Sequence, residues 1–254
     1  MELYYSIIMF VFGTIFGSFY NVVGDRLPNN ESIIKPGSHC PKCGHFLKPL
    51  ELIPILSYLF QGGKCKNCKC KIPIIHPIFE SFCGIMFLIC YKVFGFSGDL
   101  LISLTFISML LIIIVSDINY YIIPDEVLIV GGLLLVIETI AFKGFNILFN
   151  HLLYGIIAFV VMLLIKLAGD FIFNKESMGG GDIKLMFFFG FILGWEMSLL
   201  TIFLGSIIGL PISLIILYKK KTNIIPFGPF LSIAAMIILL TGFNMDSLLK
   251  LLIH

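Results

Sequence analysis

Met178-Gly179-Gly180-Gly181-Asp182-Ile183-Lys184-Leu185 places a carboxylate at the end of a glycine run and directly before an apolar segment. An ionisable side chain is costly beside lipid, so an acid in such a place is a candidate for function. Asp is also a favoured residue at a helix start, where its side chain accepts backbone N–H groups. Asp182 is therefore either a helix cap or a functional acid, and the choice depends on whether a second acid lies beside it.

The composition around this stretch is that of a membrane protein. Of the 254 residues, 59% are hydrophobic and 13% are charged, and the mean hydropathy is +1.05. A soluble domain of this length cannot bury so much apolar surface, so lipid must cover part of it. The net charge of +2 is too small to indicate a nucleic-acid partner. Residues 1–18 lack a basic start and a cleavage site, which predicts a retained anchor.

Hydropathy predicts the fold class, because a spanning helix needs about 20 mainly apolar residues. A polar loop, residues 25–76, follows the first apolar segment. Residues 245–253 are too short to span and are predicted to lie at the membrane interface. We therefore predict an all-α polytopic membrane protein in the lipid bilayer, with about eight transmembrane helices: 3–23, 77–94, 100–116, 125–142, 149–169, 183–195, 198–218 and 225–241.

The basic residues predict the orientation, since Lys and Arg accumulate on the cytoplasmic side. With the N-terminus outside, most of the 17 basic residues fall in inward-facing loops, above all in residues 25–76. The third predicted span then descends to Asp117 on the cytoplasmic side. The sixth begins there at Asp182, so the two acids lie at the same depth.

Two carboxylates that share a site suggest acid–base chemistry. They cannot both ionise easily, so the pair holds one proton between them. One acid can then deprotonate a water while the other protonates the departing amine, which is peptide hydrolysis without a covalent intermediate. The glycines before Asp182 suit a backbone that an extended substrate approaches closely. Two alternatives remain: Asp117 as a polar residue at the water boundary, and Asp125 as the first acid. We interpret Asp125, which follows Pro124, as a cap of the fourth span.

Four cysteines in the polar loop form two Cys-x-x-Cys pairs, Cys40 with Cys43 and Cys65 with Cys68, and 21 residues separate the pairs. Four thiolates in this pattern predict a closed tetrahedral zinc site, structural because no coordination position stays open. The loop has few large apolar residues, so a metal would help it to fold. We predict a small zinc-ribbon-like domain between the first two spans. Nearby alternative ligands, ranked below the four, are His39, His45 and Cys70.

Taken together, the motifs resemble those of the bifunctional prepilin peptidases, which belong to the GxGD membrane aspartic proteases. The resemblance extends over nearly the whole chain and rests on motifs in the family's order. They are residues 17–23 and 26–28, the two cysteine pairs, Pro77 and Glu80, Asp117-Ile118-Asn119 leading to Asp125, residues 179–185, and residues 225–231.

This resemblance implies an enzyme of the bacterial inner membrane with its active site at the cytoplasmic face. It would remove the leader of type IV prepilins and pseudopilins after a glycine, then methylate the new N-terminal amine, commonly of phenylalanine, using S-adenosylmethionine. No glycine-rich nucleotide loop is visible, so methylation rests on the resemblance alone. The domains would be 1–24 (first span), 25–76 (zinc loop, associated with methylation) and 77–254 (peptidase). The implied catalytic pair is Asp117 and Asp182, with the motif loop formed by Gly179, Gly180, Gly181 and Lys184.

Glu80 matches an acidic position of the family, which implies a possible link to methylation. Its place near Pro77 instead predicts, from physics alone, a carboxylate that complements a helix dipole. Two other functions compete with the peptidase. A proton-coupled transporter could use Asp117 and Asp182 as a relay, although such proteins usually show an internal repeat, which we do not find. A zinc-ribbon docking protein would leave the glycine run unexplained.

Overall fold

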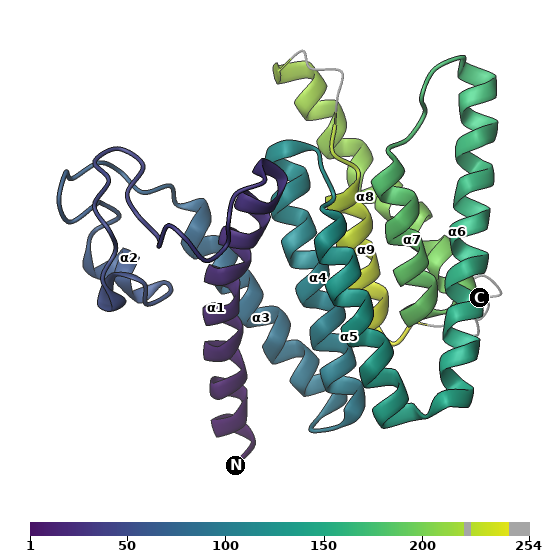
Figure 1. The fold of residues 1–254 in the computed structure, drawn as a ribbon, viewed down its shortest axis with the longest axis horizontal. Helices are drawn as coiled ribbons and strands as arrows, with labels where there is room; N and C mark the ends of the chain where they lie inside the picture. The colour runs from purple at the N-terminus through teal and green to yellow at the C-terminus, as the bar shows by residue number, and fades with distance from the viewer. Residues whose placement is uncertain (221–224, 244–254) are drawn as a thin grey trace. The chain divides into compact units, whose positions relative to one another are not determined.

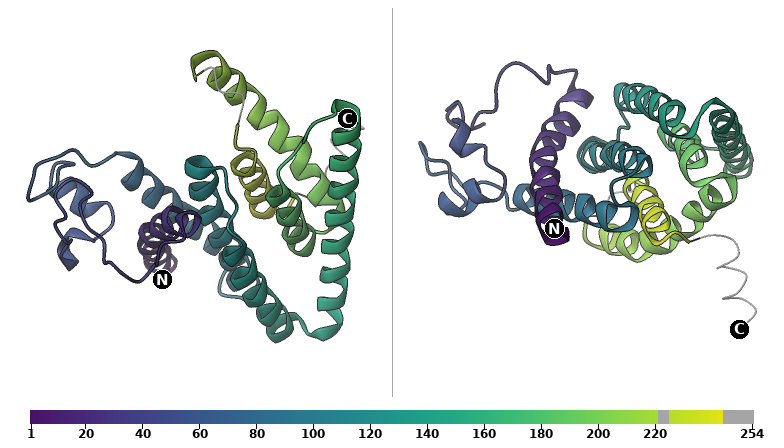
Figure 2. Two further views of the ribbon diagram at one scale, coloured as in Figure 1. Left: turned by 45° about the horizontal axis from the view of Figure 1, so that its top comes forward. Right: turned by 90° about the horizontal axis from the view of Figure 1, so that it is seen from below.

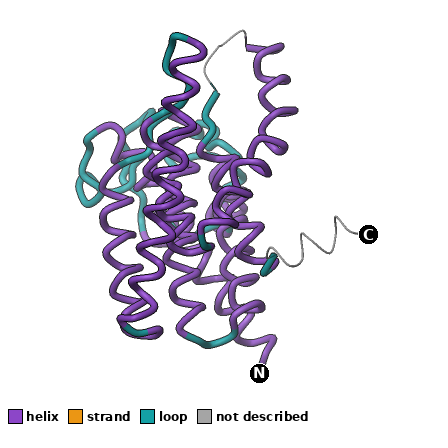
Figure 3. Tube along the Cα trace, turned by 90° about the vertical axis from the view of Figure 1, so that its right-hand side faces the viewer, coloured by secondary structure: helices purple, strands orange, loops and turns teal. Residues whose placement is uncertain are grey.

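The computed structural model describes residues 1–220 and 225–243, which form helices and loops (Figure 1; Figure 3). The predicted interface segment, 245–253, lies outside the described residues. The chain divides into two compact units, Met1–Phe96 and Ser97–His254. The predicted domain boundaries after residues 24 and 76 stay a prediction.

The first unit is built on two long helices, α1 (Glu2–Arg26) and α3 (Ile75–Phe94). Glycines on α1 allow the helices to approach closely. A Cβ atom on Gly13 would lie 2.7 Å from the Cys83 carbonyl oxygen, and one on Gly17 would lie 2.8 Å from the Cys83 Cβ. Small residues at an interface of this kind are typical of helices that pack in a membrane. The residue 17–23 motif therefore includes a packing contact of the first unit.

Between α1 and α3 the chain forms a small loop domain with little regular structure. Two isolated antiparallel bridges, His39 with Phe46 and Lys64 with Lys71, close one short hairpin around each cysteine pair. The predicted zinc-ribbon-like domain thus has the two hairpins but no extended strand in the described residues. Its helices are η1 (Leu27–Asn29), η2 (Pro49–Glu51) and α2 (Leu56–Phe60).

The second unit is a helical bundle. Its central helix is α9, which packs against α4, α7 and α8 (Figure 2). Phe106 of α4 and Phe189 of α7 are fully buried and meet edge to face with ring centroids 6.1 Å apart. The helices are α4 (Gly98–Tyr120), α5 (Asp125–Lys143), α6 (Phe145–Phe173), α7 (Gly180–Leu193), α8 (Trp195–Lys220) and α9 (Gly228–Thr241).

The helices other than α2 match the eight segments predicted from hydropathy. Within the described residues, five are long and apolar enough to cross a membrane: α1, α3, α4, α6 and α8. The protein is therefore all-α and multi-pass, as predicted. The count of eight spans stays a prediction, because α5 is not among these five and α7 and α9 have only 14 residues each.

Candidate active site

Asp117 lies near the end of α4, which continues to Tyr120 rather than ending at residue 116 as predicted. Its side chain is buried, with 6% of the residue exposed. The backbone N–H of Gly228, the first residue of α9, lies beside this carboxylate. A Cβ atom on Gly228 would lie only 2.6 Å from Asp117 Oδ2. Only glycine lets the α9 backbone come this close to the carboxylate.

Asp182 is the third residue of α7, which begins at Gly180. The N-cap residue is Gly179, and no side chain caps this helix. The interpretation of Asp182 as the helix cap is therefore wrong, because the N-cap lies three residues earlier. The carboxylate sits in the first turn, where it complements the positive end of the helix dipole, and it is half-buried.

Ile123, in the turn between α4 and α5, contacts segments close to both acids. The Ser116 hydroxyl donates to the carbonyl of Ile122 at 2.5 Å and holds this turn against α4. A Cβ atom on Gly181 would lie 3.0 Å from the Ile123 Cβ, and one on Gly228 would lie 3.5 Å from its Cδ1. Ile123 is therefore packed against both the GxGD segment and the start of α9. The two aspartates are close enough to interact electrostatically.

The loop that precedes the glycine run folds back onto α6. Ser177 donates to Asp170 Oδ1 twice, from its backbone N–H at 2.6 Å and from its hydroxyl at 2.7 Å. The same hydroxyl lies 3.2 Å from the Lys166 carbonyl oxygen. These bonds anchor the chain two residues before Gly179. The glycine segment that could face a substrate therefore starts from a defined point.

A side-chain pair that the sequence did not reveal links α5 to α7. Lys184 Nζ lies 2.7 Å and 2.9 Å from the two oxygens of Asp125. Helix α5 begins at Asp125 as expected, but its N-cap is Pro124 and no side chain caps it. The capping role given to Asp125 is therefore wrong, since its side chain pairs with a lysine 59 residues away. An exposed pair contributes only about 0–1 kcal/mol to stability.

A cavity of about 670 Å³ lies between α5, α6 and α7. Asp125 and Lys184 line it, and Lys184 is two residues beyond Asp182. The rest of the lining is apolar and aromatic, and includes Leu128, Ile129, Gly132, Leu133, Phe159, Phe187 and Phe188. Its dimensions and lining can hold an apolar segment of a ligand beside the acids.

In the first unit, the loop domain brings four thiols together. The sulfurs of Cys40, Cys43, Cys65 and Cys68 all lie within 4.8 Å of one another. Two of the separations are 3.8 Å, Cys40 to Cys68, and 4.0 Å, Cys43 to Cys65. A tetrahedron with zinc–sulfur bonds of about 2.3 Å has edges of about 3.8 Å, so the four positions fit a zinc ion.

The backbone of each hairpin favours the thiolate form that metals bind. N–H groups of Cys43 and Lys42 point at the Cys40 sulfur and lower the pKa of that thiol to about 6. In the second hairpin, N–H groups of Cys68 and Asn67 lower the pKa of Cys65 in the same way.

Comparison with known proteins agrees with this geometry. The model described as "Bacterial Peptidase A24 N-terminal domain" matches residues 11–94, and the "Type IV leader peptidase family" matches residues 104–214. A protein of Bacillus subtilis is 35% identical over 238 residues, which cover 92% of this chain and 94% of the relative. The chain belongs to the type IV leader peptidase family.

Two further relatives support the same assignment to the leader peptidase family. One from Myxococcus xanthus is 30% identical and covers 84% of this chain but 63% of its own length. One from Pseudomonas aeruginosa is 32% identical and covers 91% of this chain and 88% of the relative. All three relatives are named "Prepilin leader peptidase/N-methyltransferase". No solved structure matches the chain.

Within the N-terminal part of this leader peptidase, Glu80 has a different partner from the one expected. Helix α3 begins at Ile75, so Glu80 lies beyond its first turn and does not complement the helix dipole as predicted. Its buried carboxylate accepts the backbone N–H of Ile55 at 2.8 Å. Ile55 has φ 60° and ψ −53°, a costly conformation for a β-branched residue. Glu80 therefore holds a strained loop residue against α3.

The names of the relatives also imply a methyl donor. A cavity of about 220 Å³ in the first unit is lined by Ser18, Arg26, Leu52 and residues of the 33–38 loop. Its charged group is a cation, whereas a sulfonium donor would be recognised by carboxylates. The lining holds no carboxylate that could face the sulfonium, and we derive no step through this cavity.

Proposed function

We propose that this leader peptidase removes the leaders of type IV prepilins and pseudopilins with Asp117 and Asp182 as its catalytic pair. The observation that carries the proposal is the placement of Asp117. Its buried carboxylate lies beside the Gly228 N–H and in direct electrostatic reach of Asp182, which stands at the start of another helix. Two acids from separate helices would have little reason to meet in an apolar bundle unless they act together.

The roles of the two acids follow from their partners. Asp117 lies beside a backbone N–H, an arrangement that suits a carboxylate, so we assign it as the base that deprotonates the attacking water. Asp182 then carries the shared proton and donates it to the departing amine. The exposed glycines, Gly179 and Gly180, leave room for an extended peptide beside this acid.

The apolar cavity beside Lys184 supplies a place for the substrate. We propose that it receives the apolar residues that follow the cut, starting with the phenylalanine common in prepilins. Aromatic lining from Phe187 and Phe188 suits such a side chain. The Lys184–Asp125 pair joins two of the three helices that line this cavity, but as an exposed pair it adds little to their stability.

We further propose that the chain has eight spans with its N-terminus outside and its acids at the cytoplasmic face of the bacterial inner membrane. The distribution of basic residues supports this orientation. Zinc, held by the four thiols, would stabilise the loop domain as a structural ion. N-methylation of the new amine by S-adenosylmethionine is proposed from family membership.

Mass spectrometry of a candidate pilin from cells with and without this protein tests the proposal. With the protein present, the pilin should lose its leader after a glycine and gain one methyl group. Unchanged pilin mass, together with proton-dependent flux in liposomes that contain the protein, would favour the transporter instead.

A further inference from the structure

The two cysteine hairpins have the same backbone design. In the first, the Cys40 N–H donates to the His45 carbonyl at 2.9 Å and the Gly44 N–H donates to the Cys40 carbonyl at 2.9 Å. In the second, the Cys65 N–H donates to the Cys70 carbonyl at 2.9 Å and the Lys69 N–H to the Cys65 carbonyl at 3.0 Å. The residue between the second cysteine and the acceptor has positive φ in both: 68° at Gly44 and 58° at Lys69. Cys70 therefore occupies the position that His45 holds in the first hairpin.

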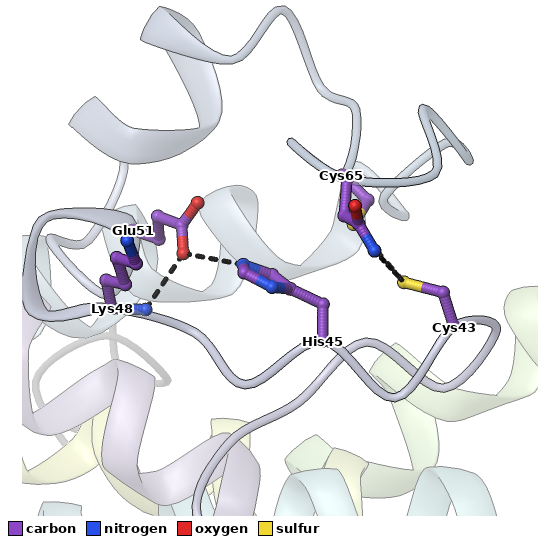
Figure 4. Close-up of polar contacts among 6 residues, drawn as sticks. Cys43, His45, Lys48, Glu51 and Cys65 are labelled. Atoms are coloured by element: carbon purple, nitrogen blue, oxygen red, sulfur yellow. Dashed lines mark hydrogen bonds and ion pairs between the residues drawn. The ribbon is translucent and has the colours of Figure 1, made fainter.

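The side chains at these equivalent positions point to different partners. His45 turns away from the thiols, and its Nε2 lies 3.0 Å from Glu51 Oε2 (Figure 4). Glu51 is buried and also accepts the backbone N–H of Lys48 at 2.8 Å. These contacts occupy the imidazole outside the metal site. In the first hairpin, then, no spare ligand from this position faces the thiols.

Cys70, in contrast, turns into the cluster. Its sulfur lies 3.5 Å from that of Cys40, slightly closer than the 3.8 Å between Cys40 and Cys68. Cys70 therefore lies beside Cys40 as a fifth thiol at the edge of the four-thiol cluster, whereas the metal takes four. Cys68 and Cys70 are the two thiols that lie near Cys40 on the same side of the cluster. Cys68 is exposed, and Cys70 is only partly exposed.

We propose that Cys70 is an alternate fourth zinc ligand, which replaces Cys68 when Cys68 is alkylated or removed. This inference rests on the proposed zinc site and adds a residue to it. Cys43 and Cys68 are the two exposed ligands and are therefore the two most open to chemical attack, since thiol reactivity follows exposure. Of these two, Cys68 is the one that lies near Cys40 together with Cys70. An exchange to Cys70 keeps four thiolates on the metal, and the loop domain stays folded.

Cobalt substitution tests the exchange in the full-length protein, purified in detergent, because the charge-transfer and d–d bands of bound Co²⁺ report the number of thiolates. Wild type, C68S and C70S should each bind one ion with a four-thiolate spectrum, and their affinities in chelator competition should agree within about tenfold. C68S/C70S and the matched control C43S should bind the ion on the order of 100-fold more weakly. In each of these variants one of the four coordination positions has no thiolate to fill it.

The outcomes separate the two hypotheses. If wild type binds neither Co²⁺ nor Zn²⁺, the proposed zinc site is wrong. If wild type shows four thiolates but C68S weakens as much as C43S, the site stands and the exchange is wrong. Alkylation of metal-loaded wild type gives a second test that no variant's folding can affect. Peptide mapping should find one label per chain, distributed between Cys68 and Cys70, and a label confined to Cys70 would overturn the exchange.

Discussion

Replacing Gly228 with alanine tests the contact on which the proposed active site depends. The new Cβ atom would lie 2.6 Å from Asp117 Oδ2, whereas ordinary contact begins near 3.4 Å. The carboxylate must therefore retreat by about 0.8 Å, the difference between those distances. A displacement of about 1 Å in a catalytic group can cost on the order of 100-fold in rate, or about 2.7 kcal/mol of transition-state stabilisation. We expect kcat/KM for cleavage of a purified prepilin to fall by roughly this factor.

Other glycines around the site provide graded controls. A Cβ atom on Gly180 would meet nothing within 4 Å, and one on Gly179 would lie 3.6 Å from Asp182 Oδ2. Alanine at either position should therefore disturb the two acids less than Gly228→Ala does, and any loss of cleavage should appear in KM for the peptide rather than in kcat. Gly181→Ala should be intermediate, because its Cβ would lie 3.0 Å from the Ile123 Cβ. Since Gly228 is the first residue of a helix, alanine is compatible with its backbone. A cleavage rate in Gly228→Ala equal to that of the wild type would refute the proposed contact. Equal losses of rate in all four glycine variants would refute it as well.

Two further substitutions test the cavity and the loop. Leu133→Trp should fill the cavity and raise KM for prepilin about tenfold, with little change in kcat. Ile137→Trp is the control: Ile137 is exposed on the same helix but does not line the cavity, so both constants should stay unchanged. Equal effects of the two substitutions would contradict the substrate role of the cavity. Glu80→Ala should free the strained Ile55 and destabilise the first unit by about 1–3 kcal/mol. Limited proteolysis within residues 27–75 should then be faster, while peptidase activity persists. Unchanged proteolysis would show that this hydrogen bond does not hold the loop.

The helices could be predicted from the sequence because lipid imposes a strict rule on the backbone. Polar backbone groups in the apolar layer must be paired within the chain, so long apolar runs become helices. The segments read from hydropathy therefore match the eight long helices. Their ends were less predictable, because ends depend on caps and turns. Helix α4 runs on to Tyr120, and α7 begins at Gly180 because a glycine, not Asp182, takes the N-cap position.

Contacts between distant segments account for most of what the sequence could not show. Gly228 belongs to a motif that was recognised, yet nothing in that motif reveals that its N–H reaches Asp117, which lies 111 residues earlier. The sequence places Lys184 in the GxGD motif and Asp125 at the start of the fourth predicted span, and neither position indicates that the two side chains pair. Cys70 lies outside the Cys-x-x-Cys spacing, so the sequence predicts it only as a lower-ranked alternative ligand. Its equivalence to His45, and its sulfur 3.5 Å from that of Cys40, come from the structure.

The most direct test of the central claim is cleavage of a purified prepilin by variants of this protein at each acid. Asp117→Asn and Asp182→Asn should each abolish leader removal, while Asp125→Asn, which breaks only an exposed ion pair, should keep substantial activity. Mass spectrometry of the product gives the measurement, and the amount of folded protein in detergent serves as the control. Cleavage retained by folded Asp117→Asn or folded Asp182→Asn would contradict the assignment of these two aspartates as the catalytic pair.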